Sequence, residues 1–200
     1  RGIIQFSNID IADLDAGYTL DDNARAMIAL TSHYEMTGEA SDLELIRVYL
    51  DFVRYCQKTD GSFDNYVDYN GNFNICNNSE NLEDSNGRAI WSLGFLLSKN
   101  IFDKQLIDKA KNCMQIALQN VEHITSPRAM AFIIKGLYYY SLNNNDREIS
   151  RLINMFAERL IECYDKVANK DWQWFEDYLT YANAVLPEAM LYAWKTTGKT

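Results

Sequence analysis

The sequence has few of the side chains that build metal sites or disulfide frameworks. It contains four cysteines, none in a CxxC spacing, and two histidines: Cys56, Cys76, Cys113, Cys163, His33 and His123. Without a cluster of these ligands a zinc site is not expected, and we predict neither a metal nor a cofactor. Three of the cysteines fall in helical patterns, which favours buried free thiols in a reducing compartment, here the cytoplasm.

Two further absences restrict the partners. No stretch approaches the roughly 20 apolar residues that a membrane-spanning helix needs. Basic residues are in the minority, 19 Lys and Arg against 28 Asp and Glu, so the net charge is −9. A chain of this charge repels phosphate backbones and anionic lipid surfaces. We therefore expect neither a nucleic-acid partner nor a membrane partner.

Hydrophobic periodicity predicts about seven helices and no sheet. Three of the helices, at residues 42–57, 103–119 and 147–165, carry apolar side chains on one stripe and charged side chains opposite. This one-sided pattern is typical of helices that lie at the surface of a domain. The other four, at 22–37, 86–99, 127–143 and 186–196, are apolar nearly all the way round. Such helices must be buried on most sides.

Buried and amphipathic helices thus alternate along the chain, and short links make each pair an antiparallel hairpin. An inner layer wrapped by an outer layer in this order predicts an all-α fold of the α/α-toroid type. A complete toroid of six hairpins needs about twelve helices. We therefore expect residues 1–200 to form a single toroid domain that is cut off at its C-terminal end, and we expect the chain to be a trimmed piece of a longer protein.

Polar clusters precede the buried helices and repeat between them. "DDNARAMIAL" at 21–30 matches "DSNGRAIWSL" at 84–93, and Arg128 and Glu188 take the place of the arginine in the third and fourth buried helices. Asp, Asn, Ser and Pro at these positions are typical helix-start residues. Because alternate helices of a toroid run in the same direction, we expect all four clusters to meet at one face.

These clusters have two interpretations. In one, the acids cap the helices and the arginines tie neighbouring helices together. In the other, they line a shared site, because capping needs one acceptor whereas Asp21 with Asp22 and Glu83 with Asp84 supply two carboxylates each. An arginine in the first turn also opposes the helix dipole and calls for an acidic partner or ligand. Paired carboxylates around a pocket suit glycoside hydrolysis.

Two long loops, 59–83 and 166–182, lead into buried helices and are rich in aromatic and amide side chains. Long loops in a compact domain are often functional. Trp172 and Trp174 beside Glu176 suggest an apolar platform for a sugar ring, although the same aromatics could instead cover the core. Gly61 and Gly71 are expected in turns.

Four ordered stretches resemble a bacterial family of α/α-toroid domains found alone or fused to glycosyltransferases. They are "GYTLDDNARAMIAL", "DGSFDNYVDYNG", "EDSNGRAIWSLG" and "WQWFEDYLTYANAVLPEAML", and together they span most of the chain. The resemblance implies carbohydrate metabolism. One departure concerns the last stretch, where the family tends to have Asp and Arg around Asn-Ala and this chain has Ala182 and Val185.

The leading hypothesis is a saccharide-binding domain, glycoside hydrolase-like if it is active, with Asp22, Asp84 and Glu176 as the candidate acid and base. The predicted saccharide contacts are Tyr18, Asp21, Arg25, Asn65, Glu83, Arg88, Arg128, Trp172, Trp174, Tyr181, Asn183 and Glu188. A non-catalytic sugar-binding or scaffold domain serving a fused glycosyltransferase is the alternative. A third reading, an isoprenoid cyclase-like toroid, is disfavoured by the amide-rich loops. The helix edges of an incomplete ring would favour a homo-oligomer.

Overall fold

The computed structural model describes residues 2–144 and 146–198 and confirms the all-α class. Seven α-helices account for most of this part of the chain: α1 (Leu20–Thr37), α2 (Ala40–Cys56), α3 (Glu83–Leu97), α4 (Lys104–Ala117), α5 (Pro127–Ser141), α6 (Arg147–Val167) and α7 (Val185–Thr197). Each matches a predicted helix to within about three residues, the usual uncertainty of helix ends.

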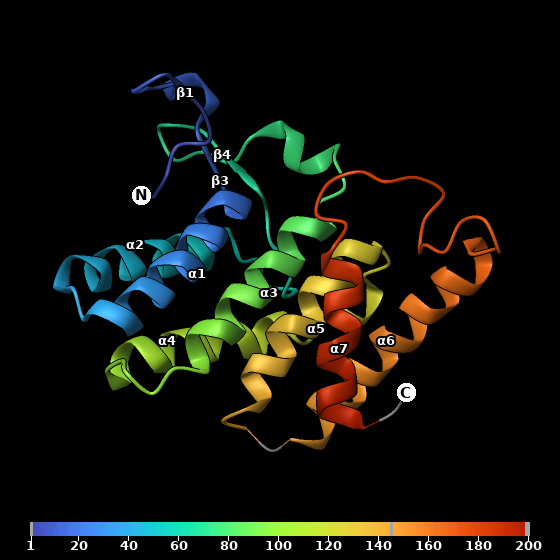
Figure 1. Cartoon of the computed structure of the whole chain (residues 1–200). Helices are drawn as coiled ribbons and strands as arrows, with labels where there is room; N and C mark the ends of the chain where they lie inside the picture. The colour runs from blue at the N-terminus through green and yellow to red at the C-terminus, as the bar shows by residue number, and fades with distance from the viewer. Residues whose placement is uncertain (1, 145, 199–200) are drawn as a thin grey trace.

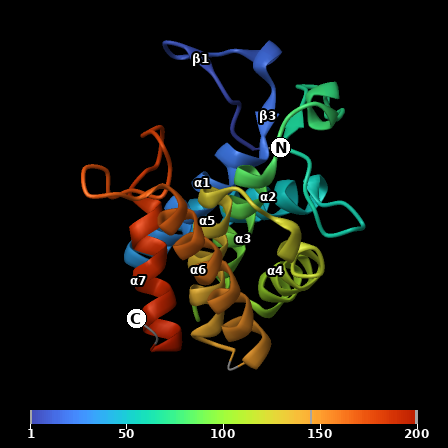
Figure 2. The ribbon, with the colours of Figure 1, turned by 90° about the vertical axis from the view of Figure 1, so that its right-hand side faces the viewer.

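Short strands, which the periodicity did not predict, and turns connect these helices. Gly61 and Gly71 lie in turns, as predicted. β1 (Ser7–Asn8) pairs antiparallel with β2 (Ile11–Ala12), and β3 (Tyr18–Thr19) pairs antiparallel with β4 (Tyr66–Val67). Three 3₁₀ turns, η1 (Leu14–Ala16), η2 (Ile75–Asn78) and η3 (Val121–His123), complete the connections. The β1–β2 hairpin forms an arm that stands away from the helices (Figures 1 and 2).

The helices pack in two layers. α1, α3, α5 and α7 contact one another in that order, while α2, α4 and α6 each pack against the helix that precedes them. The helices of the first layer all begin toward the top of Figure 1, as their common direction requires. α1 and α7 lie at opposite ends of the row, yet Arg25 and Glu188 line one hollow, so the row is curved.

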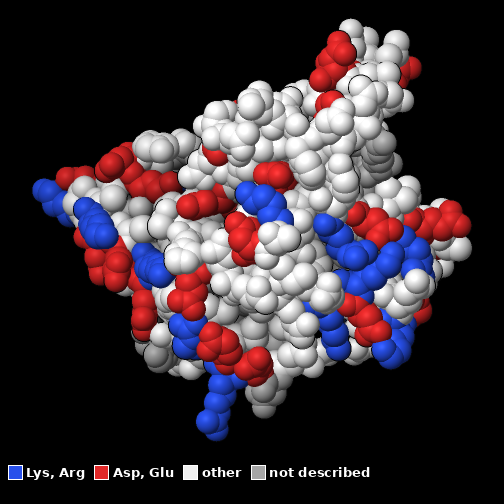
Figure 3. All heavy atoms as spheres, turned by 180° about the vertical axis from the view of Figure 1, so that it is seen from behind, with Lys and Arg blue, Asp and Glu red and all other residues white. Residues whose placement is uncertain are grey.

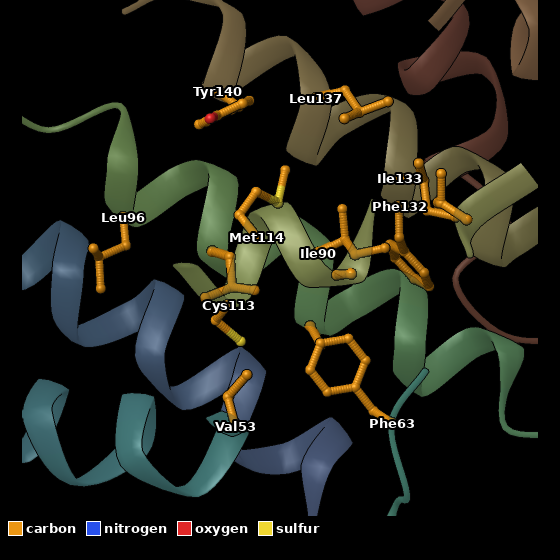
Figure 4. Close-up of a cluster of buried hydrophobic side chains, with 14 of the residues drawn as sticks. Val53, Phe63, Ile90, Leu96, Cys113, Met114, Phe132, Ile133, Leu137 and Tyr140 are labelled. Atoms are coloured by element: carbon orange, nitrogen blue, oxygen red, sulfur yellow. The ribbon is translucent and has the colours of Figure 1, made fainter. Parts of the chain in front are cut away.

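The hydrophobic core fills the space between the two layers. Its side chains come from every helix and from the loop after α2, and those labelled in Figure 4 include Val53, Phe63, Ile90, Met114 and Ile133. All five are at most 2 % exposed. The burial of α3 and α5 on nearly all sides agrees with their lack of a polar stripe. The same prediction is wrong for α1 and α7, which lie at the ends of the row and bury only one side.

Two glycines set the spacing between α3 and α5. A Cβ on Gly94 would lie 2.0 Å from the carbonyl oxygen of Gly136, and a Cβ on Gly136 would lie 2.6 Å from the carbonyl oxygen of Ile90. Both obstacles are backbone atoms, which cannot rotate away as a side chain would. The two helices therefore approach closely only because these positions carry no side chain.

We predict that Gly94→Ala lowers the free energy of unfolding by about 3 kcal/mol, because the helices must separate to admit the methyl group. The direction of the change is informative, because Gly→Ala in an unobstructed helix interior raises the free energy of unfolding by about 1 kcal/mol. Urea denaturation followed by circular dichroism measures the effect. Gln115→Ala on the exposed side of α4 serves as the control and should change little. A neutral or stabilising Gly94→Ala would contradict the close packing.

The prediction of buried free thiols is confirmed for two of the three helical cysteines, Cys56 and Cys113, and is wrong for Cys163. Cys56 and Cys113 are buried, whereas Cys76 and Cys163 are half-buried, and all four are free. Burial raises the pKa of the Cys56 thiol, and it raises that of Cys113 to about 12. Both thiols are therefore protonated and unreactive at neutral pH.

No helix in the described part of the chain is long and apolar enough to cross a bilayer. The surface carries charged side chains of both signs (Figure 3). Acidic and basic side chains are interspersed over the face in Figure 3, with the acidic ones in excess over the chain as a whole.

Candidate functional site

A cavity of about 610 Å³ lies where the first helical turns of the inner layer meet the N-terminal arm. We call it the main cavity. It is lined by Gln5, Phe6, Thr19, Asp21, Asp22, Arg25, Asn65, Tyr66, Asn81, Leu82, Asp84, Ser85, Arg88, Ser126 and Tyr181. The predicted meeting of the clusters at one face is confirmed for α1, α3 and α5.

The helix starts differ from the predicted ones at α1 and α3. Thr19 caps α1 by accepting a hydrogen bond from the Asp22 N–H at 3.2 Å, so Asp21 and Asp22 lie inside the first turn. α3 has no side-chain cap at all, whereas Ser126 caps α5 ahead of Pro127 as predicted. The expectation that Asp21, Asn23, Asp84 and Asn86 are N-cap residues is therefore wrong, and their side chains are free for other contacts.

The two asparagines of the repeat clamp extended chain segments. Asn23 binds the N–H of Ile3 at 3.0 Å and its carbonyl at 3.3 Å. Asn86 does the same to Phe63, at 2.8 and 2.9 Å. An amide side chain suits this task because it offers a donor and an acceptor side by side. The asparagines thus fix the loops that border the main cavity and do not line it.

Asp21 joins α1 to α3. Arg88 donates from Nη1 to both carboxylate oxygens of Asp21, at 2.5 and 2.6 Å, and Arg25 donates to Asp21 at 3.1 Å. The backbone N–H of Asp21 donates to the Asn65 side chain, which ties in the loop after α2. This carboxylate is therefore fully engaged by the protein, as the helix-tying interpretation predicted.

Asp22 and Asp84 present carboxylates to the main cavity from two different helices. Asp22 accepts from the Thr19 hydroxyl at 2.6 Å and pairs with Arg25. Asp84 accepts from the hydroxyl of Ser126 at 2.5 Å and from that of Tyr181. Within residues 2–144 and 146–198 Asp84 forms no ion pair, so it is the cavity carboxylate that has hydroxyl donors alone.

The neighbouring acid, Glu83, has a structural contact instead. Its carboxylate accepts from the backbone N–H groups of Thr125 and Ser126, at 2.8 and 2.5 Å. These N–H groups precede α5, where orphan donors and the helix dipole favour a negative charge. Glu83 is absent from the lining of the main cavity, although it was predicted to touch the ligand.

Arg128, Glu176 and Asn183 lie beside the cavity and organise the loop before α7. The buried Arg128 guanidinium donates to Glu176 at 2.6 Å, to the Tyr181 carbonyl at 2.6 Å and to the Asn183 side chain at 3.0 Å. Glu176 was predicted as a catalytic carboxylate, but this contact holds it outside the cavity lining. Ala182, the departure from the family pattern, has a left-handed backbone with φ of 50° beside Tyr181.

Aromatic side chains do line the main cavity, but they are not the predicted tryptophans. Phe6 is 61 % exposed and Tyr181 49 %, and Tyr66 also belongs to the lining. Trp172 instead donates its indole N–H to the Glu176 carbonyl at 2.7 Å, and Trp174 packs against the core. A hydrogen bond to Glu80, helped by burial, raises the pKa of Tyr66, which keeps its phenol protonated.

The remaining predicted contacts lie elsewhere. Tyr18 is buried, with its ring 5.9 Å from that of Phe52. Glu188 pairs with Lys135 at 2.8 Å in a neighbouring hollow. Sequence reasoning missed Gln5, Phe6 and Tyr66 because they belong to no helix. The one local signal was the alternation of Phe and Tyr with amides in the 59–83 loop.

The arrangement offers hydrogen-bonding groups and aromatic faces but no metal cluster. Among the described residues no three His, Cys, Asp or Glu side chains are grouped to hold a metal ion. Arg25 and Arg88 supply cations next to the carboxylates, so the cavity is polar and of mixed charge. In the comparisons with known proteins, no family model matches this chain and no curated protein matches it.

Proposed function

We propose that this chain is part of an α/α toroid that binds a saccharide in the main cavity and hydrolyses a glycosidic bond with Asp22 and Asp84 as its carboxylate pair. The observation that carries the proposal is the set of two carboxylates, contributed by α1 and α3, in one open cavity with Phe6, Tyr66 and Tyr181. The curvature of the inner row supports the toroid.

The chemistry of the lining supports a hydroxylated ligand. Aromatic faces stack on the C–H surface of a sugar ring, while carboxylate and amide groups bind its hydroxyls. Glycoside hydrolysis needs one carboxylic acid to protonate the leaving oxygen and a second carboxylate as base or nucleophile. Asp22 and Asp84 lie on the cavity lining and meet this need, whereas Asp21 pairs with two arginines, Arg25 and Arg88, and is assigned the structural role.

The non-catalytic alternative has one observation in its favour. Both Asp22 and Asp84 already accept hydrogen bonds from hydroxyl groups of the protein, as they would in a rigid binding site. In that case the domain would deliver a saccharide to a glycosyltransferase. Turnover, rather than binding, separates the two functions.

Phe6 provides the direct test of where a saccharide binds. We predict that Phe6→Ala weakens saccharide binding roughly tenfold, since loss of one aromatic stacking face is worth about 1.4 kcal/mol. Binding is measured by a glycan array, and the affinity of each hit by calorimetry. Ile9→Ala is the matched control, because Ile9 is 93 % exposed on the same arm and does not line the cavity. Equal losses in both variants, or no glycan bound by the wild type, would overturn the proposal.

Location and self-association belong to the same proposal. Four free cysteines, two of them buried, suit the cytoplasm. Leu191 and Trp194 on α7 are 63 % and 50 % exposed, which supports the expected homo-oligomer, because paired α7 helices would cover them. Size-exclusion chromatography with light scattering checks this, and a strict monomer at high concentration would count against it.

A further inference from the structure

A second hollow, of about 330 Å³, adjoins the main cavity on the inner side of the curved helix row. The side chains that define it here are Arg25, Arg88, Trp91, Phe132, Lys135 and Glu188. Arg25 and Arg88 line both spaces, so the two hollows lie on either side of these arginines. The two hollows are therefore adjacent, separated by these two side chains.

The charge of the second hollow differs from that of the main cavity. Its lining has three cations and a single acid, Glu188. Asp21 and Asp22, which pair with the two arginines, line the main cavity alone. In the described part of the chain, the hydrogen bonds of Arg88 all leave from Nη1. Its Nη2 and Nε donors thus remain for a ligand.

Lys135 is the main support for a ligand in this hollow, because it is a buried cation whose one acidic partner is half-exposed. Its side chain is 6 % exposed, and its Nζ lies 2.8 Å from Glu188 Oε2. Glu188 itself is 44 % exposed and can turn toward solvent. A buried ammonium needs several acceptors to offset its lost hydration, and one half-exposed carboxylate supplies only part of them.

Flat aromatic faces accompany these cations. The rings of Trp91 and Phe132 stack with centroids 5.7 Å apart at 5°. Lys135 Nζ lies 3.8 Å from the Trp91 centroid, and the Arg88 guanidinium lies 4.7 Å from that of Phe132. The hollow thus combines cations with apolar aromatic faces.

We propose that the second hollow binds an anionic group, a carboxylate or a phosphate, on a saccharide whose other rings occupy the main cavity. Lys135 and Arg88 bind the anion, and Glu188 holds Lys135 until the ligand replaces it. The domain's saccharides are then acidic ones. This inference rests on the proposed function, because the anionic group is carried by a saccharide that the main cavity binds.

Two substitutions with opposite expected effects on the binding of acidic glycans test the anion site. Lys135→Met keeps the apolar stem and should weaken the binding of acidic glycans at least tenfold, since a charge-assisted hydrogen bond is lost. Glu188→Gln removes the competing carboxylate and should strengthen the same binding several-fold. Neither change should alter the binding of a neutral glycan that occupies the main cavity. Circular dichroism and melting temperature establish that both variants are folded.

The probe is a glycan array that carries neutral, uronate-containing and phosphorylated glycans, with calorimetry on the hits. We expect acidic glycans among the ligands, and their affinity to fall as sodium chloride rises from about 0.05 to about 0.5 M, because salt screens the attraction. Preference for uronates or for phosphates identifies the group. Neutral glycans bound as tightly as acidic ones, or acidic binding unchanged in Lys135→Met, would overturn the anion site and leave the main cavity standing. No glycan bound at all would overturn both.

Discussion

Arg128→Met should lower the free energy of unfolding by about 3–5 kcal/mol, the usual effect of removing one partner from a buried ion pair. The Arg128 side chain is 6 % exposed and binds three groups of the loop before α7. Without it the Glu176 carboxylate, 13 % exposed, would lose its counter-ion, and its second oxygen already lacks a partner. Urea denaturation of the purified domain measures the loss.

The same variant should loosen residues 168–184, because Arg128 also holds the Tyr181 carbonyl. Limited proteolysis followed by mass spectrometry should find new cleavage in this loop. The double variant Arg128→Met, Glu176→Gln should recover part of the stability, since it removes the unpaired charge as well. Arg151→Met is the control, because that arginine forms its ion pairs at the surface, where screening by solvent leaves them little stabilising effect. An Arg128→Met variant as stable and protease-resistant as the wild type would contradict the role of this arginine.

The helices were predictable because their determinants are local. The single apolar stripe of α6 predicts burial on one side, and the apolar residues all the way round α5 predict burial on most sides. Neither prediction needs knowledge of a tertiary contact. The common direction of the inner helices followed from their alternation with outer ones, and it brought Asp21, Asp84 and Arg88 together as expected. The N-cap at Ser126 was predictable because Pro127 follows it at the first helical position.

The loops were less predictable because their positions depend on contacts distant in sequence. Thr19 rather than Asp21 caps α1, since β3 pairs with β4 and sets where the helix begins. Glu176 lies outside the cavity because Arg128, 48 residues away, binds it. Phe6 reaches the cavity because it belongs to the N-terminal arm. The Phe6 carbonyl accepts a hydrogen bond from the Asp13 N–H at 2.9 Å, which closes this arm. No periodicity in the sequence marks these pairings.

Asp84→Asn should reduce glycoside hydrolysis about a thousandfold while leaving the fold intact, because a positioned acid or base contributes roughly 10²–10⁴ to the rate. The amide keeps an oxygen that can accept from Tyr181 or Ser126, and either hydroxyl can turn to accept from the new NH₂ group. Stability and glycan affinity should therefore stay near those of the wild type. Release of reducing ends from a glycan identified by the array measures the rate.

Chemical rescue distinguishes proton transfer by Asp84 from a purely structural role. Asp84→Ala opens space beside Ser126 and Tyr181, and added formate or azide should restore part of the lost activity if a carboxylate is what the reaction needs there. Asp177→Asn, an exposed acid of the loop before α7, should behave like the wild type. Hydrolysis within tenfold of the wild type in Asp84→Asn would remove this residue from the chemistry. A wild type that binds glycans without turnover, with affinity lost in Phe6→Ala, would instead assign the cavity to binding alone, because Phe6 contributes a stacking face and no proton.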